Sequence, residues 1–148
     1  MKKEICILAS VMLLVLPALG FSASFKVYPG AKLEDVYETK QPEPGGKTLQ
    51  TSKEIVFTTS HPFESVVAYY RGIAREYRMP GGGKSVKLSS GQELKEAYFI
   101  FDNAADLSSS KHWIKIQWPY RMKGGFQGRY EIVREVTAII EEDKRTYP

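Results

Sequence analysis

The sequence of 148 residues predicts an α+β domain, in which one long helix at about 61–78 packs on one face of a mainly antiparallel sheet of five or six strands. Two patterns indicate this fold class. Apolar residues recur at steps of three and four over 61–78, which places them on one face of a helix. The other segments alternate apolar and polar residues and are joined mostly by short polar turns, which favours antiparallel strands.

The segment 61–78 is the clearest element in the chain. Ser60 is a candidate to cap the helix N-terminus with its hydroxyl, and Pro62 suits a first turn because its missing N–H has no partner there. Glu64 is favourable at the positive end of the helix dipole. Pro80 and the glycines after it end the helix. The apolar face comprises Phe63, Val66, Val67, Tyr70, Ile73, Ala74 and Tyr77.

Two segments before the helix predict a β-hairpin. Residues 48–59 are rich in threonine, isoleucine and valine, which are common in strands. Residues 33–39 fit neither period well, but the proline- and glycine-rich loop 41–46 that follows favours a strand there too. We therefore expect 33–39 to pair with 48–59.

The second half of the chain indicates a series of short strands separated by polar turns. They are 85–88, 96–102 and 112–118. The last segment, 130–143, fits a helix by its isoleucine and valine spacing and a strand by its β-branched content. We favour the strand, because a period of two places Val136, Ala138 and Ile140 on one face.

Residues 1–20 have the layout of a secretory signal peptide. Two lysines form a positive start, 5–16 is an almost unbroken apolar run, and cleavage is expected after Gly20 or after Ser24. The run is shorter than the roughly 20 residues of a membrane span, so a short membrane anchor is the less favoured alternative. We expect cleavage to leave a single domain, 21–148, that is periplasmic or secreted.

Composition and motifs argue against several chemistries. The only cysteine, Cys6, lies within the expected signal peptide, so the exported domain would have neither disulfides nor thiol catalysis. Losing two lysines and one glutamate lowers the formal charge only from +4 to +3, which does not favour nucleic acid as a partner. The segment 79–86, MPGGGKSV, lacks the first glycine of a phosphate loop and follows a helix instead of a strand.

Neither a metal ion nor another cofactor is expected. The two histidines, His61 and His112, lack the short spacing of typical zinc ligands, and a mixed site of one histidine with Asp or Glu is the less favoured alternative. We expect His61 in the first helical turn and His112 as a solvated strand residue. The segment 102–106, DNAAD, lacks the central glycine and closing glutamate of a calcium loop and indicates a turn.

The most suggestive cluster is the aromatic and basic segment 111–123, KHWIKIQWPYRMK. Alternation places Trp113 and Lys115 on one strand face and Trp118 on the other, so we expect one tryptophan in the core and the other beside cations. Stacking and charge would suit an anionic or sugar-containing ligand. The alternative is a tryptophan covered by lysine stems. The candidate ligand-binding residues are Lys111, His112, Trp113, Lys115 and Arg121.

Three stretches, YPGA at 28–31, FTTS at 57–60 and PFESVVAYYR at 62–71, together resemble a pattern in small exported bacterial proteins of uncharacterised function. There, a Tyr-Pro-Gly-Ala turn precedes a strand ending in threonine and then a helix with an aromatic–tyrosine pair. The resemblance covers about half of the exported domain. It implies export and an α+β fold, and no catalytic residue. The matching positions are Tyr28, Pro29, Gly30, Ala31, Thr58, Phe63, Val66, Val67, Tyr69 and Tyr70.

Together these features favour a non-catalytic binding or interaction module of the bacterial cell envelope. Its partner would be an envelope protein, a lipid or a wall component. The sequence has no G-x-S-x-G turn, and the carboxylate pairs of glycosidases leave no distinct sequence pattern. Two alternatives stay open: a small periplasmic hydrolase that uses carboxylates or His112, and a homodimer formed through a free sheet face.

Overall fold

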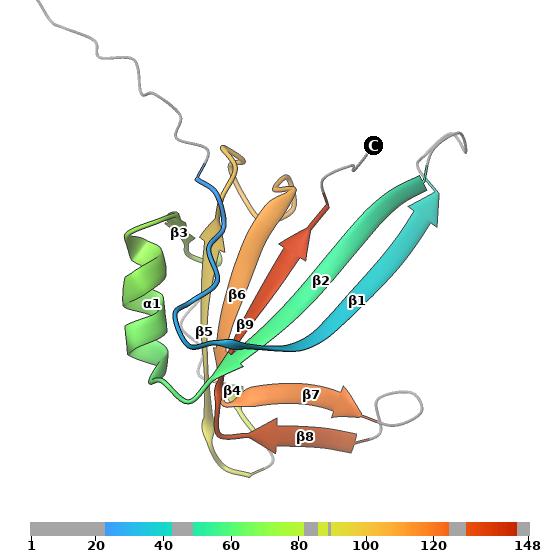
Figure 1. Cartoon of the computed structure of the whole chain (residues 1–148). Helices are drawn as coiled ribbons and strands as arrows, with labels where there is room; N and C mark the ends of the chain where they lie inside the picture. Colours follow the sequence, from blue (N-terminus) through green and yellow to red (C-terminus); the bar gives the residue numbers. More distant parts are fainter. Residues whose placement is uncertain (1–22, 43–48, 82–85, 89, 125–129, 145–148) are drawn as a thin grey trace, which may run out of the picture.

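The computed structural model describes residues 23–42, 49–81, 86–88, 90–124 and 130–144, which form a curved antiparallel sheet with one helix (Figure 1). Within these residues the elements are β1 (Lys32–Pro42), β2 (Leu49–Thr59), α1 (Phe63–Arg71), β3 (Arg75–Tyr77), β4 (Val86–Lys87), β5 (Glu93–Ile100), β6 (His112–Trp118), β7 (Tyr120–Gly124), β8 (Tyr130–Arg134) and β9 (Thr137–Asp143). The main sheet has the order β1-β2-β9-β6-β5-β3, with β4 paired to β5. The separate pair β7–β8 is also antiparallel.

The predicted fold class is confirmed, but two of its details are wrong. The described part of the chain has nine strands instead of five or six, because β3 adds to the edge of β5, β7 follows β6, and the segment 130–143 divides into β8 and β9, whereas β4 is the strand expected at 85–88. The helix has nine residues and ends at Arg71, well before residue 78. Gly72 follows it, and glycine is a poor helix former. Residues Arg75–Tyr77 then form β3, which pairs with β5. Ile73 and Tyr77 therefore keep the apolar spacing of a helix although the helix has already ended.

The helix N-terminus also differs from the expectation. Pro62 is the cap residue, and no side chain caps the helix, so the predicted role of Ser60 is wrong. Glu64 lies in the first turn as expected. His61 precedes the helix instead of lying in its first turn. It is exposed, and its Nδ1 lies 2.9 Å from the Tyr28 hydroxyl.

The strand predictions outside this region are mostly confirmed. β1 and β2 form the expected hairpin, with ten registered pairs from Lys32↔Thr58 to Pro42↔Leu49. The segment 130–143 forms strands, as favoured, although a break at Glu135 and Val136 divides it into β8 and β9. The expected signal peptide, residues 43–46 of the expected loop 41–46 and residues 82–85 of the glycine-rich segment 79–86 lie outside the described residues. None of the described helical segments is both long and apolar enough to cross a membrane.

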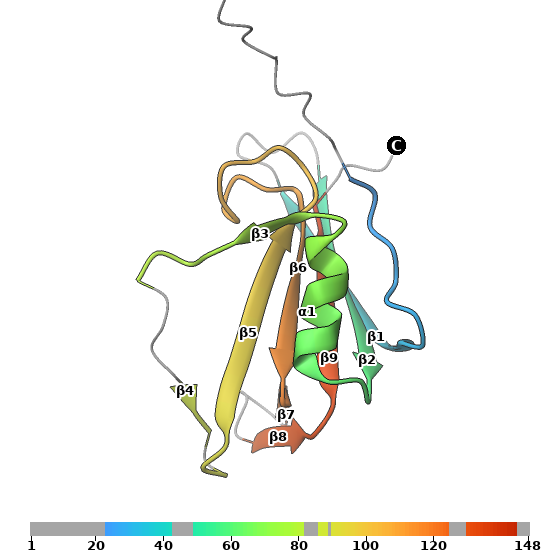
Figure 2. The ribbon, with the colours of Figure 1, turned by 90° about the vertical axis from the view of Figure 1, so that its left-hand side faces the viewer.

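The main core lies between the sheet and a cover formed by α1 and the segment 23–31 (Figure 2). Tyr70 of α1 is fully buried at its centre, and its hydroxyl donates a hydrogen bond of 2.9 Å to the Lys26 carbonyl. The Phe25 ring stacks parallel to the Tyr70 ring, with centroids 6.1 Å apart. The segment 23–31 is therefore fastened to the helix by both a hydrogen bond and ring packing. The buried core residues are Tyr28, Val66, Val67, Tyr70, Ala97, Phe99, Phe101, Ile114, Ile116 and Ile139.

The opposite face of the sheet is covered over only part of its length. The β7–β8 hairpin lies on the side of the sheet away from α1 (Figure 1). Its Tyr120 packs with Val56, Ala138 and Ile140 in a second, smaller core. Val136 packs against this core, so the predicted shared face of Val136, Ala138 and Ile140 is confirmed.

Candidate functional site

The uncovered part of the sheet opposite α1, which we call the outer face, presents aromatic and charged side chains together. Ile114 and Ile116 point into the core under α1, so the alternating residues Trp113 and Lys115 point the other way. Trp113 is paired in register with Glu142 of β9. Side chains from three further positions in the neighbouring registers complete the outer face. Its residues are Tyr37, Glu54, Tyr98, Trp113, Lys115 and Glu142.

An aromatic pair lies at one end of the outer face. The rings of Tyr98 and Trp113 are tilted at 45°, with centroids 6.2 Å apart. Within the described part of the chain, Trp113 Nε1 is the one buried side-chain nitrogen or oxygen without a hydrogen-bond partner. Buried N–H groups are nearly always paired. This indole N–H is therefore a donor for which the protein itself supplies no acceptor.

Two carboxyl groups meet in the middle of the outer face. Partial burial, and then the hydrogen bond with Glu54 and the charge of that residue, raise the pKa of Glu142 to about 7. Lys144 and then Lys115 act in the opposite direction and lower the pKa of Glu142. With a pKa of about 7, the Glu142 carboxyl is partly protonated near neutral pH, so it both donates and accepts hydrogen bonds.

The structure brings only two of the five predicted ligand-binding residues together. Trp113 and Lys115 share the outer face, whereas His112 points to the opposite side of β6. Lys111 is exposed before β6, and its backbone N–H donates to Asp102. Arg121 lies in β7, where its backbone N–H donates to a glutamine side chain of β6.

The two tryptophans lie on opposite faces, as the alternation predicts, but neither is fully buried. Trp118 lies toward α1, where Lys95 Nζ is 5.4 Å from its ring centroid and 2.6 Å from a Glu64 carboxylate oxygen. The expectation of one core tryptophan is therefore wrong. Trp118 lies near the start of α1, where the lysine covers it in place of apolar side chains.

A second group of polar residues is buried on the α1 side of the sheet, near the end of β9. Glu141 and Asp143 point to the same side as Ile139, and His112 of β6 lies opposite Asp143 in the register. The exposed fractions of His112, Glu141 and Asp143 are 4%, 6% and 3%. His112 Nε2 lies 2.8 Å from Glu141 Oε1. We call these three residues the His–Glu–Asp cluster.

The expectation that His112 is solvated is therefore wrong. The aromatic rings of Phe25 and Phe101 pack against its imidazole, with centroids 6.2 and 5.2 Å away. Sequence reasoning also missed both carboxylates of the cluster. The available signal was that Glu141 and Asp143 continue, at a spacing of two, the face occupied by Ile139.

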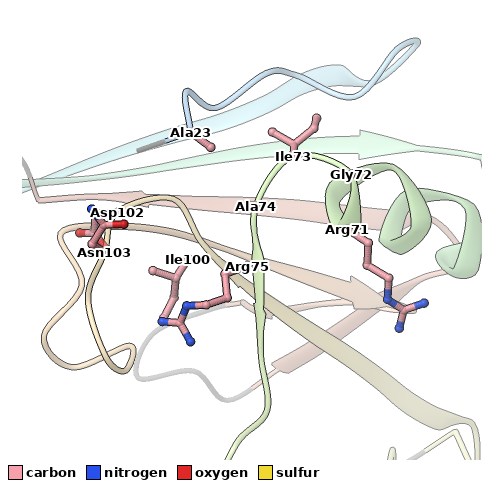
Figure 3. A pocket seen from close by; sticks show the side chains of 9 residues that line it. All are labelled: Ala23, Arg71, Gly72, Ile73, Ala74, Arg75, Ile100, Asp102 and Asn103. Carbon is pink, nitrogen blue, oxygen red and sulfur yellow. The ribbon is translucent and has the colours of Figure 1, made fainter. Parts of the chain in front are cut away.

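One pocket of about 330 Å³ lies between the end of α1, the start of β3 and the turn after β5 (Figure 3). Arg71 and Arg75, at its rim, extend in different directions (Figure 3). Both guanidinium groups are engaged within the protein, Arg71 with Glu76 at 2.7 Å and Arg75 with the Ala104 carbonyl. The pocket therefore offers fewer available polar groups than the outer face.

The segment 102–106 forms a turn, as expected, and the Asp102 side chain stabilises it through local hydrogen bonds. Asp102 accepts hydrogen bonds from the Ala104 N–H at 3.3 Å, from the Ser110 hydroxyl and from the Lys111 N–H. These bonds use both carboxylate oxygens of Asp102 within the turn itself.

Comparisons of the chain with protein-family models, with curated proteins and with solved structures find no match. The functional proposals therefore rest on the geometry of the outer face and of the His–Glu–Asp cluster.

Proposed function

We propose that the protein is an exported, non-catalytic binding module of the bacterial cell envelope and that its ligand binds on the outer face. One observation carries this proposal. The tilted Tyr98–Trp113 pair lies on the same face as Lys115 and the carboxyl groups of Glu54 and Glu142. The layout of residues 1–20 supports export.

The chemistry of the outer face fits a sugar-containing ligand better than an anionic one. Aromatic rings offer flat apolar surfaces with polar edges, which suit the C–H faces of sugar rings. Carboxyl groups accept hydrogen bonds from sugar hydroxyls, and the ammonium group of Lys115 donates to them. An anionic ligand would meet Glu54 and Glu142 as well as Lys144 and Lys115, and the like charges of the carboxylates oppose its binding. A wall polysaccharide is therefore the ligand class we favour.

The two tryptophans allow a direct test, because they lie on opposite faces of β6. In Trp118→Phe the fluorescence comes from Trp113 alone, and in Trp113→Phe it comes from Trp118 alone. Soluble neutral and acidic oligosaccharides are titrated into both variants. We expect saturable changes in emission from Trp118→Phe and none from Trp113→Phe. A Tyr98→Ala variant should weaken binding about 5-fold, since one aromatic contact contributes on the order of 1 kcal/mol.

The same samples separate binding from catalysis. Mass spectrometry after incubation should return each oligosaccharide unchanged, and native mass spectrometry of the exported protein should show a retained ligand or the processed chain alone. Cleaved oligosaccharide would favour the hydrolase alternative. If no oligosaccharide changes the Trp113 emission at millimolar concentration, the sugar-binding proposal is wrong.

A specific observation also favours a homodimer as a second candidate, formed by pairing of an edge strand instead of through the sheet face expected from the sequence. Strand β1 is at the edge of the main sheet and, within the described residues, pairs only with β2. Leu33, Val36 and Tyr37 on this edge strand are exposed by 62%, 42% and 48%. Long edge strands with exposed apolar side chains are prone to pair with another chain. Native mass spectrometry over a range of concentrations should then show a dimer that Val36→Lys abolishes.

A further inference from the structure

The His–Glu–Asp cluster combines one imidazole and two carboxylates in a space that excludes water. One nitrogen or oxygen atom from each of the three side chains lies within 4.8 Å of the other two. All three residues are more than nine-tenths buried. Strands β6 and β9 fix their positions through a continuous register, so the three donors converge from a rigid part of the fold.

The charge of the cluster needs compensation. Removing a carboxylate from water costs several kcal/mol unless an opposite charge or hydrogen bonds replace the water. Contacts within the protein compensate part of this cost, because His112 bonds to Glu141 and Asp143 also has an interaction partner. A divalent cation at the centre of the cluster would balance both carboxylates at once.

The geometry is close to that of a metal site. Zinc binds imidazole nitrogen and carboxylate oxygen at about 2.0–2.2 Å, so two ligand atoms of a tetrahedral site lie about 3.4 Å apart. The donors of the cluster, which lie within 4.8 Å of one another, need to shift by at most about 1.5 Å to meet this requirement. The hydrogen bond of 2.8 Å between His112 Nε2 and Glu141 would be replaced by metal bonds, with the N–H of a neutral imidazole on the other ring nitrogen.

We propose that His112, Glu141 and Asp143 bind one divalent transition-metal ion of the Zn²⁺ type. One imidazole nitrogen favours zinc, cobalt or iron over calcium and magnesium, which prefer sites made only of oxygen. Three protein ligands leave at least one coordination position for water or another small ligand. The ion would lie beneath Phe25, so binding would fasten the segment 23–31 to the sheet. This site is on the opposite side of the sheet from the outer face and does not depend on the proposed ligand there.

The wild-type protein provides the first test, because it has only two histidines. The imidazole resonances of His112 and His61 are followed by NMR while Zn²⁺ is added to protein purified with a chelator and then dialysed. His61→Asn identifies which resonances belong to which ring. We expect the His112 resonances to change and to saturate at one equivalent, whereas those of the exposed His61 stay unchanged. A His112 ring that does not respond, or that responds only after several equivalents, would overturn the proposal.

Variants provide the second test. Asp143→Asn and Glu141→Gln should each weaken Zn²⁺ binding at least 10-fold by calorimetry. Glu142→Gln is the matched control, because it lies between them in sequence but points to the outer face. At a Zn²⁺ concentration 100 times the Kd, the wild-type unfolding constant should fall about 100-fold. Equal affinity in all three variants would contradict the assignment, and so would saturation of the cluster by Ca²⁺ but not by Zn²⁺. Since the NMR test uses wild-type protein, a variant that fails to fold leaves the proposal testable.

Discussion

The hydrogen bond from Tyr70 to the Lys26 carbonyl holds the segment 23–31 against the helix, and Tyr70→Phe removes it with little other change. The ring stays in place between Phe25, Phe99 and Phe101, with which it packs at centroid distances of 6.0 to 6.3 Å. A net hydrogen bond contributes about 1 kcal/mol, and the carbonyl left without its partner adds to the cost. Because Lys26 itself is exposed, water replaces part of the lost bond. We therefore expect Tyr70→Phe to lower the free energy of unfolding by about 1 kcal/mol.

Tyr70→Ala removes the ring as well and leaves a cavity in the centre of the main core. Truncation of a buried aromatic side chain to alanine costs about 3–5 kcal/mol. The difference between the two variants separates the contribution of the hydroxyl from that of the ring. It also shows how far the folded state depends on packing between α1 and the segment 23–31.

The assay is urea unfolding followed by circular dichroism, combined with amide hydrogen exchange. Tyr98→Phe is the control, because its hydroxyl bonds to exposed Glu96 at 3.1 Å and should contribute less than about 0.5 kcal/mol. In Tyr70→Phe the amide of Ala31, which bonds to the Tyr28 carbonyl, should also exchange faster than in wild type. If Tyr70→Phe is as stable as Tyr98→Phe and its Ala31 exchange is unchanged, the bond does not fasten this segment.

Three further predictions follow from individual contacts. Gly30→Ala should lose about 1 kcal/mol in urea unfolding, because Gly30 has a φ of +82° that disfavours a side chain even though the space is open. Thr137→Val keeps the shape of a fully buried residue but removes its 2.7 Å bond to the His61 carbonyl, and should lose about 1 kcal/mol in the same assay. Hydrogen bonds from Ser108 and Ser109 lower the pKa of Asp106 from 3.8 to about 2. Because the folded state favours the ionised carboxylate, this group stabilises the fold above about pH 4. At pH 5 the urea midpoint of unfolding should therefore be higher for wild type than for Asp106→Asn. This difference should disappear as the pH falls through 4 toward 2. A difference that stays constant over this range would contradict the lowered pKa of Asp106.

The sequence predicted the elements whose pattern extends over several residues and whose ends carry strong signals. The β1–β2 hairpin and the strand 112–118 follow from composition and alternation, and both are present. The end of α1 could not be predicted in the same way. Ile73 and Tyr77 continue the helical spacing, but the free edge of β5 accepts this segment as a strand. The pairing of this segment with β5 therefore outweighed its helical apolar spacing. Helix propensity alone does not predict such pairing between distant strands.

The candidate sites were less predictable, because they depend on which strands become neighbours. Trp113 and Lys115 share a face through simple alternation, so the sequence placed them together. Glu54 and Glu142 join them only because β2 pairs with β9, at a sequence separation of 88 residues. His112 seemed solvated because a histidine at a strand start is usually exposed. Its burial depends on Phe25, which comes from the other end of the domain.

Strands β6 and β9 each contribute to both candidate sites, and the period of two keeps these contributions apart. His112 and Trp113 are adjacent in β6 but point to opposite sides of the sheet, as Glu141 and Glu142 do in β9. Because the strands are hydrogen-bonded over six registered pairs, neither side chain of an adjacent pair changes face without loss of the register. A substitution at Trp113 or Glu142 therefore tests the outer face, and one at His112 or Glu141 tests the His–Glu–Asp cluster. Any coupling between sugar and metal binding would have to pass through the backbone of these two strands.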